Sequence, residues 1–296
     1  MIGRALADRL EASGDEVVRL VRRPPRAEGG RRSSDALWDP ADGVLDPAIV
    51  SGADAVVNLA GAPIARLPWT PLYKRTILES RLEATRTIVD ALHVAARAPR
   101  VLVNASAVGF YGDRGEEDLT EDAPRGTGFL SAVVKAWEEE ADRASDVTRV
   151  ALVRTGLVVG PSGAMPPLRL IARLGLAGPL GSGRQWWPWI SLHDEVAAID
   201  HLIGSPGGGS QLRGPVNFAG PTPATASQFM RALATGLRRP YGMPAPALAL
   251  RLALQDAADE LLLASQRMLP AALLADGFRF RDETVGAALD ALPDAR

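Results

Sequence analysis

The chain has 296 residues, is 47% hydrophobic, carries a formal net charge of −2 and contains no cysteine. The dispersed basic residues do not indicate a nucleic-acid partner, and the absence of cysteine excludes a disulfide framework or a thiolate metal site. Three scattered histidines give no metal-ligand spacing, no apolar run is long enough to span a membrane and no signal peptide is visible, so we expect a cytoplasmic protein without a metal.

The first segment of the chain has the pattern of a helix with nothing in front of it. Its apolar residues are spaced four apart on one face, at Ile2, Leu6 and Leu10, and a strand follows at 17–21. In a dinucleotide-binding fold, a buried strand and a glycine-rich turn come before such a helix. Ile2 and Gly3 resemble the end of that turn. We therefore expect the first strand to be missing through a wrongly chosen start codon; a natural protein without it is the alternative.

Strand and helix patterns then alternate. The apolar run 53–59 is typical of a strand buried on both faces, and a long amphipathic helix follows at 71–96. A strand is predicted at 100–108, a helix at 129–145 and a strand at 150–159. This alternation predicts an α/β fold, a Rossmann-like doubly wound parallel sheet that lacks its first strand.

The pattern changes after residue 161, where Gly and Pro become dense. A short strand is predicted at 214–219, a capping box at Thr225–Gln228 and further helices at 247–254, 257–264 and 282–291. We expect two domains: a nucleotide-binding domain over 1–160 and a smaller, mostly helical C-terminal lobe over 161–296. The stretch 190–220 is expected to return to the core.

Ligands of such sheets bind beyond the carboxyl ends of the strands. The strand at 17–21 ends at Arg22 and Arg23, and arginine there suits the 2′-phosphate of NADP, whereas an acidic residue would suit NAD. The alternative is a pair of solvated loop charges. The buried run ends in Asn58-Leu59-Ala60-Gly61, and the small residues there let the backbone approach a ligand closely. A tight turn without a ligand is the alternative.

Two further strand ends carry candidate side chains. Ser106 and Tyr111 follow one strand, where the serine can bond a substrate oxygen; a hydroxyl satisfied by backbone and a packing tyrosine are the alternatives. Arg184, Gln185 and Trp187 lie in a tryptophan-rich stretch that can line a pocket for a flat or sugar-like ligand, or form a hydrophobic hinge between lobes.

Several segments together, in this order, carry a family resemblance. They are Asp54–Gly61 with Pro63-Ile64, Trp69, Ser80-Arg81, Ser106–Gly112, Phe129 with Trp137-Glu138, Arg154-Thr155-Gly156, Gly181–Gln185 with Trp189-Ile190, and Ser265-Gln266-Arg267 with Pro270 and Gly277-Phe278. The chain resembles the extended short-chain dehydrogenase/reductase superfamily, and more closely its atypical branch of epimerase-family proteins with a short C-terminal domain. The resemblance covers the whole chain.

The resemblance implies an NADP(H) site. Its expected contacts are Gly3 at the pyrophosphate turn, Arg22 at the 2′-phosphate, Leu59 and Ala60 near the adenosine and ribose, Thr76 and Arg81 on the long helix, and Leu157 near the nicotinamide. Ser106 matches the serine or threonine that assists carbonyl chemistry in the superfamily.

Three departures from the superfamily pattern bear on these expectations. The earlier glycines of the pyrophosphate turn are absent. Superfamily enzymes use Tyr-x-x-x-Lys, whereas here Lys135 stands at the lysine position and Ser131 at that of the tyrosine, so the proton donor is left to Tyr111 or a bound water. Trp187 occupies the region of an arginine that grips nucleoside-diphosphate sugars, so such a substrate is not supported.

We therefore expect an NADP(H)-dependent oxidoreductase or epimerase-like enzyme that acts on a small molecule, with Ser106 and Lys135 among its catalytic residues. The alternative is a catalytically inactive NADP(H)-binding sensor or scaffold. A third hypothesis is that the chain as written is a fragment that binds no cofactor. The sequence leaves the substrate and the oligomeric state open.

Overall fold

Four parallel strands form the central sheet, in the order β10 (Gly214–Phe218), β6 (Arg149–Thr155), β4 (Val101–Ala107) and β3 (Ala55–Asn58). The computed structural model describes residues 1–23, 35–204 and 209–292. The parallel Rossmann-like fold predicted from the alternating pattern is confirmed. Both faces of β4 and β6 are buried, which explains why their sequences are nearly continuous apolar runs.

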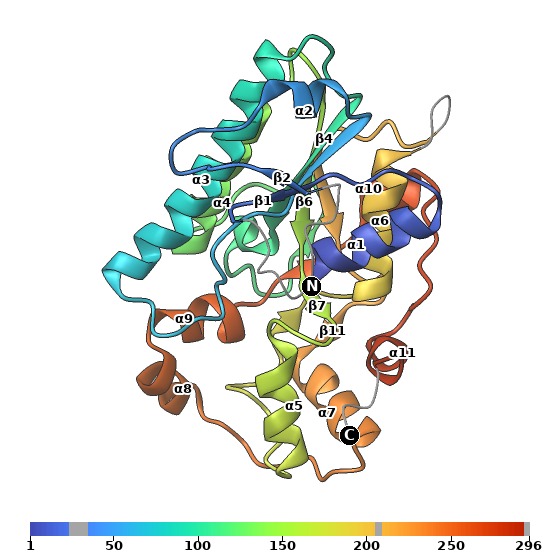
Figure 1. The fold of residues 1–296 in the computed structure, drawn as a ribbon. Helices are drawn as coiled ribbons and strands as arrows, with labels where there is room; N and C mark the ends of the chain where they lie inside the picture. Colours follow the sequence, from blue (N-terminus) through green and yellow to red (C-terminus); the bar gives the residue numbers. More distant parts are fainter. Residues whose placement is uncertain (24–34, 205–208, 293–296) are drawn as a thin grey trace.

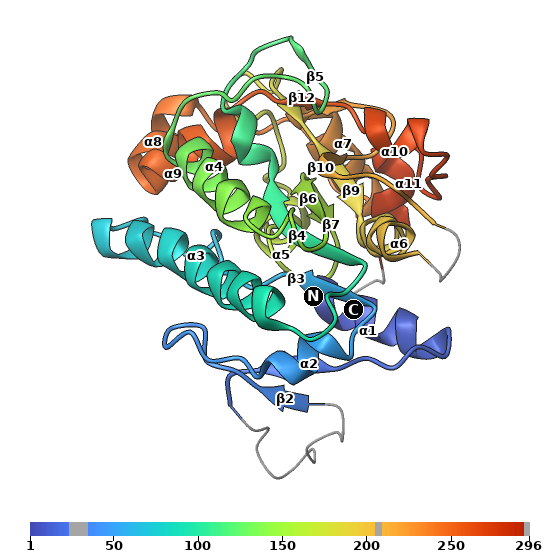
Figure 2. The same cartoon turned by 90° about the horizontal axis from the view of Figure 1, so that it is seen from above.

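Helices cover both faces of this sheet (Figures 1 and 2). On one face, α1 (Ile2–Ala12) and α6 (Leu192–Ile203) pack against Val101, Val103 and Val153. On the other, α3 (Pro71–Val94) and α4 (Phe129–Asp142) pack against Leu102 and Leu152. The alternation of strand side chains between two faces divides the core into these two clusters. A short helix, α2 (Pro47–Ser51), packs beside α3.

Strands β1 (Arg19–Val21) and β2 (Asp35–Leu37) form a separate two-stranded parallel sheet. Within the described ranges, neither strand pairs with the central sheet. Arg19 donates to Asp35 across the pair, with 2.6 Å between Nη2 and Oδ1. The single doubly wound sheet expected from the sequence is therefore observed as two parallel sheets.

The strand predicted at 150–159 is interrupted at Gly156. There the amide of Gly156 donates to the carbonyl of Phe218, and a Cβ atom would lie 2.6 Å from the carbonyl oxygen of Pro188. Only glycine fits such a close approach of two backbones. The chain continues as β7 (Leu157–Val159), which leaves the central sheet and pairs with β9 (Trp189–Ser191).

The C-terminal lobe is mostly helical (lower half of Figure 1). Its apolar core is shared by α5 (Met165–Arg173), α7 (Ala226–Gly236) and α11 (Val285–Asp290). The remaining elements are η1 (Val108–Tyr111), β5 (Asp118–Leu119), β8 (Trp186–Trp187), β11 (Ala224–Thr225), α8 (Ala247–Leu254), α9 (Asp256–Ala258), the π-helix η2 (Asp259–Leu263), β12 (Arg267–Met268) and α10 (Ala271–Ala275).

The capping box predicted at the start of α7 is confirmed. The amide of Gln228 donates to Thr225 Oγ1 at 3.2 Å, and the amide of Thr225 donates to Gln228 Oε1 at 2.7 Å. In the described ranges, none of the helices combines the length and the hydropathy that crossing a membrane requires.

Candidate functional site

The turn after β3 is fixed by a buried amide side chain. Asn58 donates from Nδ2 to Asn104 Oδ1 at 2.7 Å and to Thr85 Oγ1 at 3.0 Å, and its Oδ1 accepts from the amide of Ala60 at 3.1 Å. These bonds hold the chain at Leu59 and Ala60, so that both residues remain partly exposed at the carboxyl edge of the sheet. The three hydrogen bonds make this turn rigid before any ligand arrives.

The beginning of α1 lies at the same edge. A Cβ atom at Gly3 would lie 3.6 Å from Leu59 Cδ1, and Met1 contacts Gly160, which follows β7. Met1 supplies no side-chain cap to this helix, and the first amides of an α-helix have no acceptor within the helix itself. Such amides, together with the helix dipole, form a favourable position for a phosphate.

Arg81 closes the turn from the α3 side. Its guanidinium donates to the carbonyls of Ala62 at 3.2 Å and Ile77 at 2.9 Å, and stacks 5.0 Å from the centre of the Trp137 ring. Burial lowers the pKa of Arg81 to about 10. A Cβ atom at Gly61 would lie 3.3 Å from this side chain. Arg81 therefore stabilises the turn that follows β3.

The other predicted cofactor contacts differ in their exposure. Arg22 and Arg23 are exposed directly after β1, and residues 24–34, which follow, lie outside the described ranges. Thr76 is exposed on α3 and donates to the carbonyl of Leu72 at 3.1 Å. Leu157 is half-buried in β7. Arg22, Arg23 and Thr76 are therefore open to solvent. In the described part of the chain, no hydrogen bond joins any of these residues to another of them.

A buried polar network lies beneath the ends of β4 and β6. Arg154 is 3% exposed and binds Glu138 through two hydrogen bonds of 2.8 Å. Ser106 donates to Glu138 Oε1 at 2.6 Å. Tyr111 accepts from Arg154 Nη1 at 3.0 Å and donates to Asn217 Oδ1 at 2.7 Å. Ser106 and Tyr111 are thus brought into one network, as neighbours of an internal ion pair.

Burial raises the pKa of the Tyr111 phenol, against the opposing effect of Arg154. The acceptors within reach of its hydroxyl are Asn217 Oδ1 at 2.7 Å and the carbonyl oxygen of Thr120 at 3.1 Å, and the hydroxyl proton of Ser106 is directed to Glu138. Each hydroxyl has only one proton to donate. In this arrangement neither side chain offers a proton to a ligand at the strand ends.

Ser131 and Lys135, both on α4, make separate contacts. Ser131 is fully buried in α4, and its hydroxyl lies 2.9 Å from the carbonyl oxygen of Gly126 and 3.0 Å from that of Phe110. Lys135 is half-exposed and forms an ion pair with Glu139 one turn further along the helix. The hydroxyl thus ties two loops together, and the ammonium group lies at the helix surface.

The tryptophan-rich stretch divides into packed and open residues. Gln185 donates to the carbonyls of Leu180 and Leu262, and Trp187 donates to Leu262 at 3.0 Å while it packs edge-on against Phe229. Both are buried. Arg184 is exposed and lines a cleft of about 320 Å³ together with Trp186. Of the three predicted substrate residues, only Arg184 therefore lies at an open cleft.

Glu138 and Arg154 had no assigned role in the sequence prediction. A signal was present, because Glu138 stands within the apolar stripe Val134, Trp137, Ala141 of its helix, and Arg154 stands inside a β-strand apolar run. A charged residue at a position that faces the core is normally paired with an opposite charge. The sequence does not identify the two residues as partners, because they meet only in the tertiary structure.

Glu260 of the C-terminal lobe caps α4. Its carboxylate accepts from the amides of Phe129 at 2.7 Å and Leu130 at 3.1 Å, where Gly128 leaves room for it. We expect Glu260→Ala to lower the free energy of unfolding by about 1–2 kcal/mol, because the first amides of α4 lose their acceptor. Urea unfolding measures this. The adjacent Asp259→Ala, in an exposed pair with Arg251, is the control; equal effects would contradict the cap.

Comparisons with known proteins agree with this architecture. Residues 1–213 match the model of the NAD dependent epimerase/dehydratase family, and residues 245–292 match a domain of unknown function, DUF1731. Epimerase family protein MT2273 of Mycobacterium tuberculosis is 40% identical over 291 residues, which cover 98% of this chain and 93% of that protein. Epimerase family protein SDR39U1 of Homo sapiens is 33% identical over 294 residues, which cover 97% of this chain and 94% of that protein.

Two solved structures are similar over the length of the chain. The crystal structure of human epimerase family protein SDR39U1 with NADPH has a TM-score of 0.87 at 32% identity, and the match covers 98% of this chain and 95% of that one. The nucleoside-diphosphate sugar epimerase of Corynebacterium glutamicum has a TM-score of 0.78 at 32% identity, covering 98% of this chain and 55% of that one.

Proposed function

The chain belongs to the NAD dependent epimerase/dehydratase family, and from this premise we propose that it binds NADP(H) and acts as an oxidoreductase or epimerase-like enzyme on a small molecule. The observation that carries the proposal is the placement of the first turn of α1 against Leu59, at the edge where β3, β4 and β6 end. The similarity to a structure with NADPH supports the same cofactor.

Two features favour the phosphorylated cofactor. Arg22 and Arg23 follow β1 and are exposed, so their guanidinium groups are free to approach a 2′-phosphate. The amides at the start of α1 suit the pyrophosphate, and Leu59 and Ala60 offer a partly exposed apolar surface to the adenosine. Leu157 would shield the nicotinamide side, where bound NADPH supplies a hydride to a carbonyl carbon.

Proton transfer then depends on a group outside the network of Ser106 and Tyr111. The proton of Ser106 is directed to Glu138, and that of Tyr111 to one of two internal acceptors, Asn217 Oδ1 or the carbonyl oxygen of Thr120. For Ser106 to donate to a substrate oxygen, its hydroxyl would have to rotate away from Glu138. We assign the serine a role in holding the substrate oxygen once its hydroxyl has rotated away from Glu138, and leave proton delivery to a water molecule.

Titration with NADPH and NADH, followed by calorimetry, tests the cofactor. We expect NADPH to bind more tightly, and Arg22→Ala to weaken NADPH by about 10-fold or more while leaving NADH nearly unchanged, because a charge-assisted bond to the extra phosphate is lost. Arg239→Ala, an exposed arginine beyond α7, is the matched control. The absence of NADPH binding, or equal loss in both variants, would refute the site.

The contacts of Ser131 and Lys135 favour a second function. The serine is buried and bonded to backbone, and the lysine is paired at the surface, so the tyrosine–lysine pair of superfamily enzymes has no counterpart on α4. We propose, as the alternative, a sensor that binds NADP(H) without turnover. Tight NADPH binding without oxidation across a panel of carbonyl compounds would support the sensor, whereas oxidation above background would support the enzyme.

A further inference from the structure

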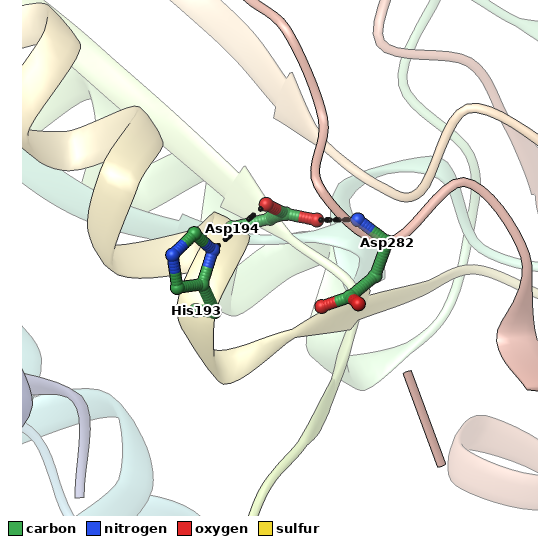
Figure 3. Close-up of side chains that lie close together, drawn as sticks. All are labelled: His193, Asp194 and Asp282. Carbon is green, nitrogen blue, oxygen red and sulfur yellow. Dashed lines mark hydrogen bonds and ion pairs between the residues drawn. The ribbon is translucent and has the colours of Figure 1, made fainter. Parts of the chain in front are cut away.

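Three side chains with metal-ligating atoms meet at the start of α6 (Figure 3). His193 and Asp194 stand in the first turn of that helix, and Asp282 comes from the segment that precedes α11. One nitrogen of His193 and one oxygen of each aspartate all lie within 4.8 Å of one another. The two segments are almost ninety residues apart, so no sequence spacing could reveal the cluster.

Asp194 organises the cluster through backbone bonds. Its Oδ1 accepts from the amide of Arg281 at 3.0 Å, and its Oδ2 accepts from the amide of Asp282 at 3.0 Å. His193 Nδ1 lies 3.2 Å from Asp194 Oδ1. In the structure this contact is a hydrogen bond, and because two ligands held about 2.1 Å from one cation are themselves about 3.0–3.4 Å apart, a cation can replace the shared proton without moving either atom.

Asp282 supplies the observation that points to a ligand. The residue is only 5% exposed, and its Oδ2 has no hydrogen-bond partner. Its other oxygen lies 3.8 Å from Arg281 Nε, beyond hydrogen-bond distance. A buried carboxylate oxygen without a donor is costly, and such groups are normally paired or bound to a metal. His193 and Asp282 also line a cleft of about 330 Å³, through which an ion can enter.

We propose that His193, Asp194 and Asp282 bind a divalent first-row cation, with Zn²⁺ as its representative. One imidazole and two carboxylates are ligands of the type that Zn²⁺ takes, and water from the cleft completes the coordination. The two negative charges balance the charge of the ion. Because some of the ligand atoms are up to 4.8 Å apart, the side chain of Asp282 turns inward when the cation binds.

An anion is the competing occupant, since Arg9 and Arg281 also line the cleft. Arg9 is already paired with Asp200 at 2.7 Å, which removes most of its attraction for an anion. An anion seated between His193 and Asp194 would also face the free oxygen of Asp282, a repulsive contact. The converging carboxylates therefore favour a cation.

A cation held in this way would join α6 to the C-terminal lobe. Two of its ligands stand on the helix that packs against the central sheet, and the third stands just before α11, which packs against α7. Because the ion would bind only the folded arrangement of these segments, it would stabilise the native state in proportion to its affinity. The role we infer is structural.

The test uses the full chain, freed of metal with a chelator, and titrates Zn²⁺ by calorimetry. We expect one ion per chain, bound about 10-fold or more weakly by His193→Gln and by Asp282→Asn. Co²⁺ should give the visible absorption of a site with nitrogen and oxygen ligands. Asp282→Asn should still fold, because Asp194 is bonded to the backbone amide of residue 282 and not to its side chain.

The matched control is His201→Gln. His201 Nε2 lies 2.8 Å from Asp276 Oδ2, a histidine–aspartate pair of the same kind, and within the described part of the chain it belongs to no three-ligand cluster. Zn²⁺ should bind this variant as tightly as the parent chain, and at one Zn²⁺ concentration it should raise the melting temperature of both by more than that of Asp282→Asn. Absence of Zn²⁺ binding, undiminished affinity in Asp282→Asn, or an equal loss in His201→Gln would each overturn the proposal.

Discussion

Replacing Arg154 with leucine is expected to lower the free energy of unfolding by about 3–5 kcal/mol, because the substitution leaves a buried carboxylate without its cation. Arg154 is 3% exposed and Glu138 is 8% exposed, and two hydrogen bonds of 2.8 Å join them. Tyr111 also loses the guanidinium that donates to its oxygen. Urea unfolding at neutral pH, followed by circular dichroism, measures the change.

The control for this substitution is an exposed ion pair on α4, the helix that carries Glu138. Lys135 and Glu139 form an ion pair in which the two side chains are 49% and 63% exposed. Exposed pairs contribute about 0–1 kcal/mol, so Lys135→Ala should change the stability little. A second test replaces both buried partners, as Glu138→Leu with Arg154→Leu, and should recover much of the loss because no unpaired charge remains. Equal effects of Arg154→Leu and Lys135→Ala would contradict the assigned role of the network.

This ion pair also decides how the strand ends are presented to a ligand. Glu138 holds the hydroxyl of Ser106, Arg154 holds the phenol of Tyr111, and Asn217 of β10 joins the same chain of bonds. These bonds join α4, β4, β6 and β10 below the carboxyl edge of the central sheet. Rigid support of this kind keeps the binding residues in place before the ligand arrives.

The sequence predicted the parts of the fold that local pattern determines. Apolar runs at 53–59 and 100–108 indicated buried parallel strands, and the stripe over 71–96 indicated the long helix α3. The break at Gly156 was not predicted, because its cause is the carbonyl of Pro188, a contact that exists only after folding. The division of the parallel strands into two sheets likewise depends on long-range pairing.

The candidate site was predictable to the same extent. The candidate strand ends at Leu59 and Ser106 followed from the topology of parallel sheets, whereas Leu157 was implied only by the family resemblance. The direction in which a hydroxyl or an ammonium group points did not, because it depends on partners such as Glu138 for Ser106 and Glu139 for Lys135. Position along an element can be inferred from periodicity, whereas hydrogen-bond partners in a buried network require the tertiary structure.

Glu195→Gln is expected to stabilise the protein at alkaline pH and to leave its stability almost unchanged near pH 5. Glu195 is 1% exposed; its Oε1 accepts from Thr155 Oγ1 at 2.9 Å, and its Oε2 has no partner. Burial raises the pKa of Glu195 from 4.5 to about 8. The folded chain therefore keeps this proton at neutral pH, and the unfolded chain releases it.

The sign of the pH dependence follows from this difference. Between pH 4.5 and about 8 the folded state binds one more proton than the unfolded state, so raising the pH destabilises the fold, by roughly 1.4 kcal/mol per pH unit. Glutamine has nearly the same shape and no proton to lose, so the advantage of the variant should grow across this window to a few kcal/mol and then level off. Unfolding curves at a series of pH values measure that difference directly. Glu139→Gln, an exposed glutamate, should show no such growth, and a flat difference for Glu195→Gln would mean that the buried carboxyl is already ionised at neutral pH.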